Sequence, residues 1–131
     1  MSDPMLTLAR DAQKKSYAPY SNFHVGVCIK SASGKLYSGC NVENASYGLT
    51  QCAEGSAISM MVINGERNIT DVMIVGDGDL FCTPCGACRQ RLHEFSDADM
   101  TVTIVNTKGD TVSYQLSELL PHPFGSQVER N

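Results

Sequence analysis

The sequence predicts an α/β fold in which one sheet lies between two layers of helices. Segments whose apolar residues recur at helical spacing alternate along the chain with segments in which apolar and polar residues alternate, as in strands. Helices separate the later strands, and such crossover connections join parallel strands of one sheet. With 131 residues, the chain is long enough for one ordinary core, so we expect a single domain over residues 1–131.

The first third of the chain predicts a helix followed by a β-hairpin. Pro4 suits the first helical position, Ser2 or Asp3 can cap that helix, and apolar residues follow at helical spacing. Residues 23–29 alternate between apolar and polar, as expected of a strand. A Ser-Gly pair then turns the chain into a second strand at residues 35–40.

The rest of the chain alternates helices and strands. Thr50 can cap a helix through residues 52–63, which stops at an Asn-Gly pair. The elements expected after it are a strand at residues 71–76, a helix from Cys85 to about residue 95, strands at residues 101–105 and 111–116, and a helical turn at residues 117–120.

Composition and charge predict a globular protein of the cytoplasm. The formal net charge is −4, and the 10 lysines and arginines are spread along the chain, which argues against nucleic acid as a partner. No segment approaches the roughly 18 apolar residues that span a membrane, and the N-terminus does not resemble a secretory signal. Because disulfides are rare in a reducing compartment, the six cysteines point to metal binding or catalysis.

Three of these cysteines form a pattern that suits a metal ion. Cys85 and Cys88 are neighbours on one face of a predicted helix, and they lie at its start, where the helix dipole stabilises thiolates. Cys52 begins the preceding helix and can supply a third ligand, since helices on one face of a sheet can bring their N-termini together. Three thiolates leave the fourth tetrahedral position of Zn²⁺ open for water, as in catalytic sites.

Glu54 is the candidate general base of this site. Residues two apart on a helix point about 200° away from each other, so Cys52 and Glu54 should not bind the same ion in the same way. A glutamate at the edge of the site can still reach water held there. Cys-Ala-Glu followed by Pro-Cys-x-x-Cys is the three-cysteine form of the zinc deaminase signature.

At this level of detail the sequence resembles the small, typically homotetrameric cytidine deaminases, nearly from end to end. The resemblance is carried by YAPYSNF at residues 17–23, GCNVENA at 39–45, CAE at 52–54, PCGACRQ at 84–90 and LLPHPF at 119–124. It implies a five-stranded mixed sheet in a three-layer α/β/α sandwich, Zn²⁺ held by Cys52, Cys85 and Cys88, and Glu54 as the proton shuttle. The implied reaction is the hydrolytic deamination of cytidine and 2′-deoxycytidine.

The resemblance also implies which residues bind the free nucleoside. Asn41 and Glu43 match residues that hydrogen-bond the ribose hydroxyl, whereas the residues alone would indicate an ordinary polar loop. Phe23 matches a ring that packs against the nucleoside, and the carbonyl of Ala53 matches a group that orients the base. Residues that match the family's contacts between adjoining sites are Ala45, Tyr47 and Phe124. The resemblance therefore implies a homotetramer whose active sites are shared between subunits.

One position departs from the family pattern. Many three-cysteine members carry an arginine directly after Cys-Ala-Glu, whereas this chain has Gly55. Zn²⁺ with three thiolates carries one excess negative charge, which arginines offset by donating hydrogen bonds to the sulfurs. Arg89, beside Cys88, matches the family's other arginine. Arg89 would therefore support the thiolates alone unless some distant residue substitutes for the missing arginine.

Three alternatives differ in substrate or in the role of the metal. Cys82 and Cys85 form a further Cys-x-x-Cys, so four cysteines could close a structural, non-enzymatic zinc site. The blasticidin S deaminases share this size and zinc motif, although Asn-Val-Glu-Asn favours an ordinary ribose. A nucleic-acid deaminase should show a basic groove with aromatic stacking residues, and this acidic chain shows neither pattern.

Overall fold

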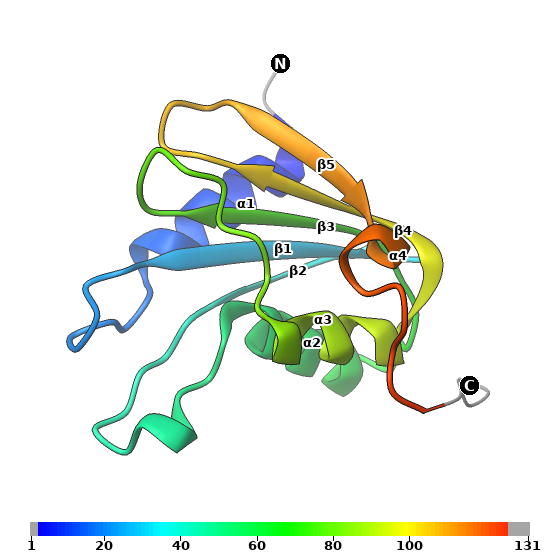
Figure 1. The fold of residues 1–131 in the computed structure, drawn as a ribbon, viewed down its shortest axis with the longest axis horizontal. Coiled ribbons are helices and arrows are strands. Elements are labelled where there is room, and N and C mark those ends of the chain that lie inside the picture. The colour runs from blue at the N-terminus through cyan, green and yellow to red at the C-terminus, as the bar shows by residue number, and fades with distance from the viewer. Residues whose placement is uncertain (1–2, 126–131) are drawn as a thin grey trace.

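A five-stranded mixed sheet runs through the molecule and carries helices on both faces (Figure 1). The computed structural model describes residues 3–125. In chain order the elements are α1 (Pro4–Lys14), β1 (Val25–Ser31), β2 (Leu36–Cys40), a 3₁₀ turn η1 (Tyr47–Leu49), α2 (Ala53–Ile63), β3 (Ile69–Gly76), α3 (Gly86–Glu94), β4 (Ser96–Val105), β5 (Thr111–Gln115) and α4 (Leu116–Leu119). Within residues 3–125, none of these helices has the length and apolar character needed to span a bilayer.

The strand pairing confirms the predicted α/β class. The strands are ordered β2-β1-β3-β4-β5, and β1 pairs with both β2 and β3 in antiparallel register. β3 and β4, which α3 separates along the chain, are parallel, as expected of a crossover connection. β5 returns beside β4 as an antiparallel strand. The sheet is therefore mixed, as the resemblance implied.

Residues of β1 alternate between two apolar clusters, one on each face of the sheet. Val27 and Ile29 belong to the cluster that contains Ala57 of α2. Cys28, which lies between them in the strand, packs instead with Ala9 of α1. Because neighbouring side chains of a strand point to opposite faces, α1 covers one face, and α2 and α3 cover the other. This arrangement confirms the three-layer sandwich (Figure 1).

The helix starts agree with the sequence at α1 and differ at α2. At α1, the carboxylate of Asp3 accepts a hydrogen bond from the backbone N–H of Met5 at 2.9 Å, and the alternative cap, Ser2, lies outside the described residues. The prediction that Thr50 caps α2 is wrong, because Cys52 occupies that position. Residue 51 is still extended and exchanges two backbone hydrogen bonds with Val42, so the helix begins later.

Gly39 of β2 brings α2 very close to the sheet. A Cβ atom at this position would lie 2.5 Å from the backbone nitrogen of Ala57 and 2.7 Å from the carbonyl oxygen of Ala53. Both atoms belong to the helix backbone, which cannot move aside as a flexible side chain can. Nearby, the hydroxyl of Ser56 donates a hydrogen bond to the carbonyl of Cys40 at 2.9 Å. Close packing at Gly39 therefore fixes the height of the α2 N-terminus above the sheet.

Replacing Gly39 with alanine should destabilise the protein by about 1–3 kcal/mol, because the added methyl group must push α2 away from β2. Urea unfolding of both proteins measures this difference. Gly48→Ala is the matched control, since a Cβ atom there meets nothing within 4 Å. Equal unfolding midpoints for Gly39→Ala and Gly48→Ala would show that α2 does not depend on this contact.

Candidate metal centre and substrate cavity

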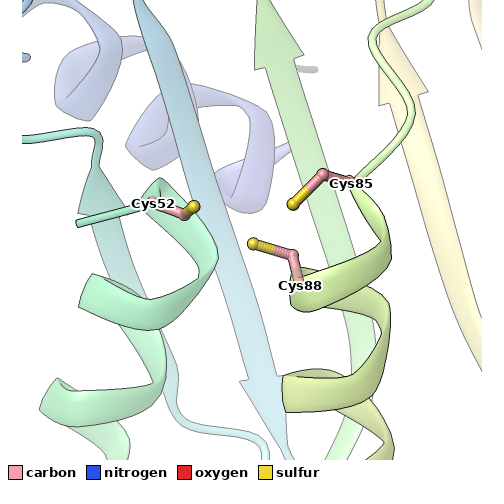
Figure 2. Close-up of side chains that lie close together, drawn as sticks. All are labelled: Cys52, Cys85 and Cys88. Carbon is pink, nitrogen blue, oxygen red and sulfur yellow. The ribbon is translucent and has the colours of Figure 1, made fainter. Parts of the chain in front are cut away.

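Three cysteine sulfurs converge where the N-termini of α2 and α3 meet. Cys52 is the N-cap of α2, Cys85 is the N-cap of α3, and Cys88 lies in the first turn of α3. Figure 2 shows the three side chains pointing toward one another from these two helices. Their sulfur atoms all lie within 4.8 Å of one another. Sulfurs bound to one tetrahedral zinc ion, at about 2.3 Å each, are separated by about 3.8 Å, so this cluster fits such an ion.

The electrostatics of the cluster favour a bound cation. A hydrogen bond from Cys88, together with the nearby positive charge of Arg91, lowers the pKa of the Cys52 thiol to about 6 although burial opposes the shift. The same hydrogen bond and burial raise the pKa of Cys88. These opposite shifts favour negative charge on Cys52 over Cys88. A divalent cation bound to the cluster would stabilise the thiolate form of its ligands.

The fourth nearby cysteine does not join the cluster. Cys82 lines the same cavity, but within residues 3–125 the group of sulfurs close enough to share an ion consists of Cys52, Cys85 and Cys88. Cys82 packs against the end of β3, where its sulfur would lie 3.4 Å from a Cβ atom placed at Gly76. This placement argues against a closed four-cysteine structural site and favours an open, three-ligand one.

The cysteine cluster forms part of the wall of a cavity of about 340 Å³, a volume typical of small-molecule sites. The lining residues are Ser21, Phe23, Val25, Asn41, Glu43, Thr50, Cys52, Ala53, Glu54, Ile74, Cys82, Thr83, Pro84, Cys85 and Cys88. This set brings together eight residues that the sequence predicted: the three cysteines, Glu54, Ala53, Phe23, Asn41 and Glu43. Apolar and polar groups thus face the same space as the sulfurs.

Glu54 lies deep in this cavity, in the first turn of α2, and only 5% of its surface is exposed. Burial raises the pKa of its carboxyl group, and the negative charge of Cys52 raises it further. A carboxyl group with a raised pKa can both accept and return a proton near neutral pH. The structure therefore gives Glu54 the environment that a proton shuttle requires.

Asn41 and Glu43 are held in place by hydrogen bonds to the neighbouring loop. The side-chain oxygen of Asn41 accepts from the backbone N–H of Val25 at 2.9 Å, and its amide donates to the carbonyl of Phe23 at 2.8 Å. The carboxylate of Glu43 accepts from the hydroxyl and the backbone N–H of Ser21. These bonds lower the pKa of Glu43, with the Ser21 hydroxyl contributing most. Ser21 is a residue that the sequence analysis missed, since its partner lies far away along the chain.

The residues expected at contacts between subunits lie outside the cavity. Ala45 is exposed, and Tyr47 and Phe124 are 78% and 87% exposed. Tyr47 lines an adjoining hollow of about 330 Å³, where its ring packs edge to face against Tyr20. The backbone of Phe124 is held by two hydrogen bonds to the side chain of Gln90 on α3. A single chain therefore leaves both rings facing outward.

Arg89 does not donate to a cysteine sulfur, so the prediction that it supports the thiolates is wrong. Its guanidinium donates instead to the carbonyl oxygens of Pro84, at 2.8 Å, and Leu119, at 2.7 Å. The physical reason is that adjacent helix residues lie about 100° apart around the axis, so Arg89 points away from Cys88.

Arg91 takes the role that the sequence analysis gave to Arg89. Its Nη1 atom donates to the sulfur of Cys88 at 3.6 Å and to that of Cys52 at 3.9 Å. Arg91 follows Cys88 by three positions, a spacing that places two side chains on one helix face. This spacing could have identified Arg91 from the sequence, because the same rule already paired Cys85 with Cys88.

Comparisons with known proteins agree with the geometry. A family model described as the cytidine and deoxycytidylate deaminase zinc-binding region matches residues 2–104. A cytidine deaminase of Sporosarcina psychrophila is 36% identical over 125 residues, which cover 95% of this chain and 92% of that protein. One from Halalkalibacterium halodurans is 40% identical over 119 residues, or 91% of this chain and 90% of that protein. The crystal structure of cytidine deaminase from Burkholderia pseudomallei, at 39% identity, has a TM-score of 0.88 and covers 95% of this chain and 100% of its own.

Serine substitution of any one cluster cysteine should abolish stoichiometric zinc binding, because it leaves two thiolates where the cluster offers three. Cys82→Ser is the matched control and should keep its zinc, since Cys82 lines the cavity without joining the cluster. Metal analysis of the purified variants Cys52→Ser, Cys85→Ser, Cys88→Ser and Cys82→Ser provides the measurement. Loss of zinc from Cys82→Ser as well would indicate a closed four-cysteine site.

Proposed function

The chain belongs to the cytidine and deoxycytidylate deaminase family, and on that premise we propose that it hydrolyses cytidine and 2′-deoxycytidine to uridine and 2′-deoxyuridine with release of ammonia. The observation that carries the proposal is the set of residues that line one cavity. A three-cysteine cluster, a buried glutamate and a polar loop that suits a sugar all face the same space of about 340 Å³. This reaction would serve the salvage of pyrimidine nucleosides.

Zn²⁺ is the metal that fits the cluster, with Cys52, Cys85 and Cys88 as its ligands. Three convergent sulfurs form a soft ligand set, and the two helix N-termini that carry them favour the thiolate form; such ligands select zinc, whereas magnesium and calcium prefer oxygen ligands. When bound, the ion supplies Lewis acidity that activates a water molecule for attack on C4 of the pyrimidine.

Glu54 moves the protons in the proposed reaction. Its carboxylate takes one proton from the attacking water and delivers it to N3 of the ring. The remaining proton of the water then reaches the amino group at C4, the C4–N bond breaks, and ammonia leaves. The water oxygen stays on C4 as the carbonyl of uridine, so the products balance cytidine plus water. Burial of Glu54, which raises its pKa, suits both proton transfers.

Asn41, Glu43 and Phe23 are the proposed contacts to the nucleoside. The carboxylate of Glu43 and the amide of Asn41 are already fixed by loop hydrogen bonds, so they can bind ribose hydroxyls without losing much side-chain entropy. Phe23 supplies an apolar ring on the same wall of the cavity. The carbonyl of Ala53 is proposed to orient the base.

We further propose a homotetramer in which subunits share active sites. Tyr47 and Phe124 are large rings with most of their surface exposed, and with Ala45 they match the family's residues between adjoining sites. A second subunit would cover these rings and close the cavity.

The strands from β1 to β5 share one sheet, which supports a single domain. All six cysteines are free thiols, which suits the reducing cytoplasm as the place where the protein acts.

Replacing Glu54 with glutamine should lower kcat for cytidine by about 10²- to 10⁴-fold, the range that general acid–base groups contribute. Zinc content should stay unchanged, because Glu54 does not belong to the sulfur cluster. The loss of cytidine absorbance measures turnover, and metal analysis of the same samples measures zinc. Asp71→Asn, which removes a carboxylate on β3 that does not line the cavity, is the control and should keep full activity.

Three outcomes of this assay separate the proposal from its rivals. Turnover of cytidine and 2′-deoxycytidine by the unmodified protein supports it. Turnover of blasticidin S without turnover of either nucleoside would identify a different cytosine nucleoside as the substrate. Full activity of Glu54→Gln would contradict the role of that residue.

A further inference from the structure

We propose that Arg91 is a positioning residue of the metal centre, which hydrogen-bonds two of the three ligand sulfurs and offsets the excess negative charge of the site. The inference rests on the zinc ligands proposed above and adds a residue that acts on them from outside the substrate cavity. Arg91 is exposed and lies in the last turn of α3.

One nitrogen of Arg91 connects the two helices that deliver the sulfurs. Nη1 lies 3.6 Å from the sulfur of Cys88 on α3 and 3.9 Å from that of Cys52 at the start of α2. This nitrogen carries two N–H groups, so it can donate one to each sulfur. Hydrogen bonds from a cation to thiolates are charge-assisted and stronger than neutral ones. Arg91 therefore helps to hold the α2 ligand in place relative to the α3 ligand.

Gly55 of α2 lies beside the side chain of Arg91. A Cβ atom at residue 55 would lie 3.8 Å from Cδ of Arg91 and 2.6 Å from the side-chain nitrogen of Gln51. These three residues line one hollow of about 400 Å³ between α2 and α3. Gly55 follows Cys52 by three positions, just as Arg91 follows Cys88. Gly55 therefore gives α2 no side chain beside Cys52, and Arg91 of α3 supplies one instead.

Arg91 contacts the sulfurs from outside the substrate cavity. The three cysteines line the substrate cavity, whereas Arg91 does not belong to its wall. A group in this place touches the ligands and not the substrate, so its effect must pass through the metal centre. Such outer groups commonly change metal affinity or activity by about 10–100-fold.

The net charge of the zinc–thiolate site explains why a cation at the position of Arg91 would matter. Three thiolates and one Zn²⁺ carry one excess negative charge, which the guanidinium of Arg91 neutralises. By drawing electron density from the sulfurs, Arg91 keeps the ion a stronger Lewis acid than three unsupported thiolates would allow. The guanidinium of Arg89 is directed elsewhere, since it donates to the carbonyls of Pro84 and Leu119.

Cobalt substitution tests the inference with a readout other than activity. Co²⁺ bound to thiolates absorbs through sulfur-to-metal charge transfer, and the energy of that band falls when the sulfurs lose hydrogen bonds. We expect Arg91→Gln to shift the band to longer wavelength and Arg91→Lys, which keeps the charge on a shorter side chain, to shift it less. Arg10→Gln is the matched control: it removes one guanidinium from α1, on the other face of the sheet, and should leave the band unchanged.

The same variants should change kcat and leave KM nearly unchanged. In the zinc-loaded enzyme, Arg91→Gln should lower kcat for cytidine by about 10-fold or more, with KM little changed because Arg91 lies outside the substrate cavity. Adding Gly55→Arg to Arg91→Gln returns a guanidinium to the neighbourhood of Cys52. The Cβ contact at residue 55 is with the flexible end of Gln51, so the double variant should fold and recover part of both effects.

Two results would contradict the account at different levels. A cobalt band at the same wavelength in Arg91→Gln and in the unmodified protein would overturn the role of Arg91 and leave the zinc ligands intact. The absence of any thiolate-to-cobalt band in the unmodified protein would overturn the ligand set itself, and with it the proposed function.

Discussion

The meeting of two helix N-termini on one face of the sheet is the constraint on which the site depends. Cys52 begins α2, and Cys85 and Cys88 begin α3, so three sulfurs come within 4.8 Å only because both helices start at the same place. The parallel crossover between β3 and β4 sets the position of α3. The close approach at Gly39 sets that of α2. Helix dipoles at both N-termini add positive potential where thiolates must form.

The residues around this junction fall into two groups, one that lines the cavity and one that lies outside it. The cavity side of the cluster holds Glu54, whose burial suits proton transfer, and the polar loop of Asn41 and Glu43. Arg91 lies outside the cavity wall, beside Gly55, and contacts two of the sulfurs. The proposed substrate contacts thus line the cavity, and the proposed charge compensation comes from outside it.

Much of the fold and the cysteine cluster could be predicted from local rules, whereas Phe23, Asn41 and Glu43 of the cavity were expected only from the family resemblance. Helical and strand periodicity gave the layers, and the spacing of Cys85 and Cys88 gave two ligands on one helix face. The start of α2 was missed because pairing of residue 51 with Val42 is a tertiary contact that overrides the preference of Thr50 for a helix cap. Arg89 was expected to support the thiolates because it matches the family's other arginine, but a helix places i and i+3 together, and Arg91 rather than Arg89 reaches Cys88. The partners of Ser21 and the packing of Cys82 depend on distant segments, which no local pattern encodes.

X-ray absorption at the zinc edge of the purified protein tests the central claim most directly, because it counts the sulfurs around the ion without depending on activity. Three thiolates from two helix N-termini predict three sulfur neighbours at about 2.3 Å and one oxygen neighbour at about 2.0 Å. Four sulfur neighbours, or a shell made mainly of nitrogen and oxygen, would contradict the open three-cysteine site.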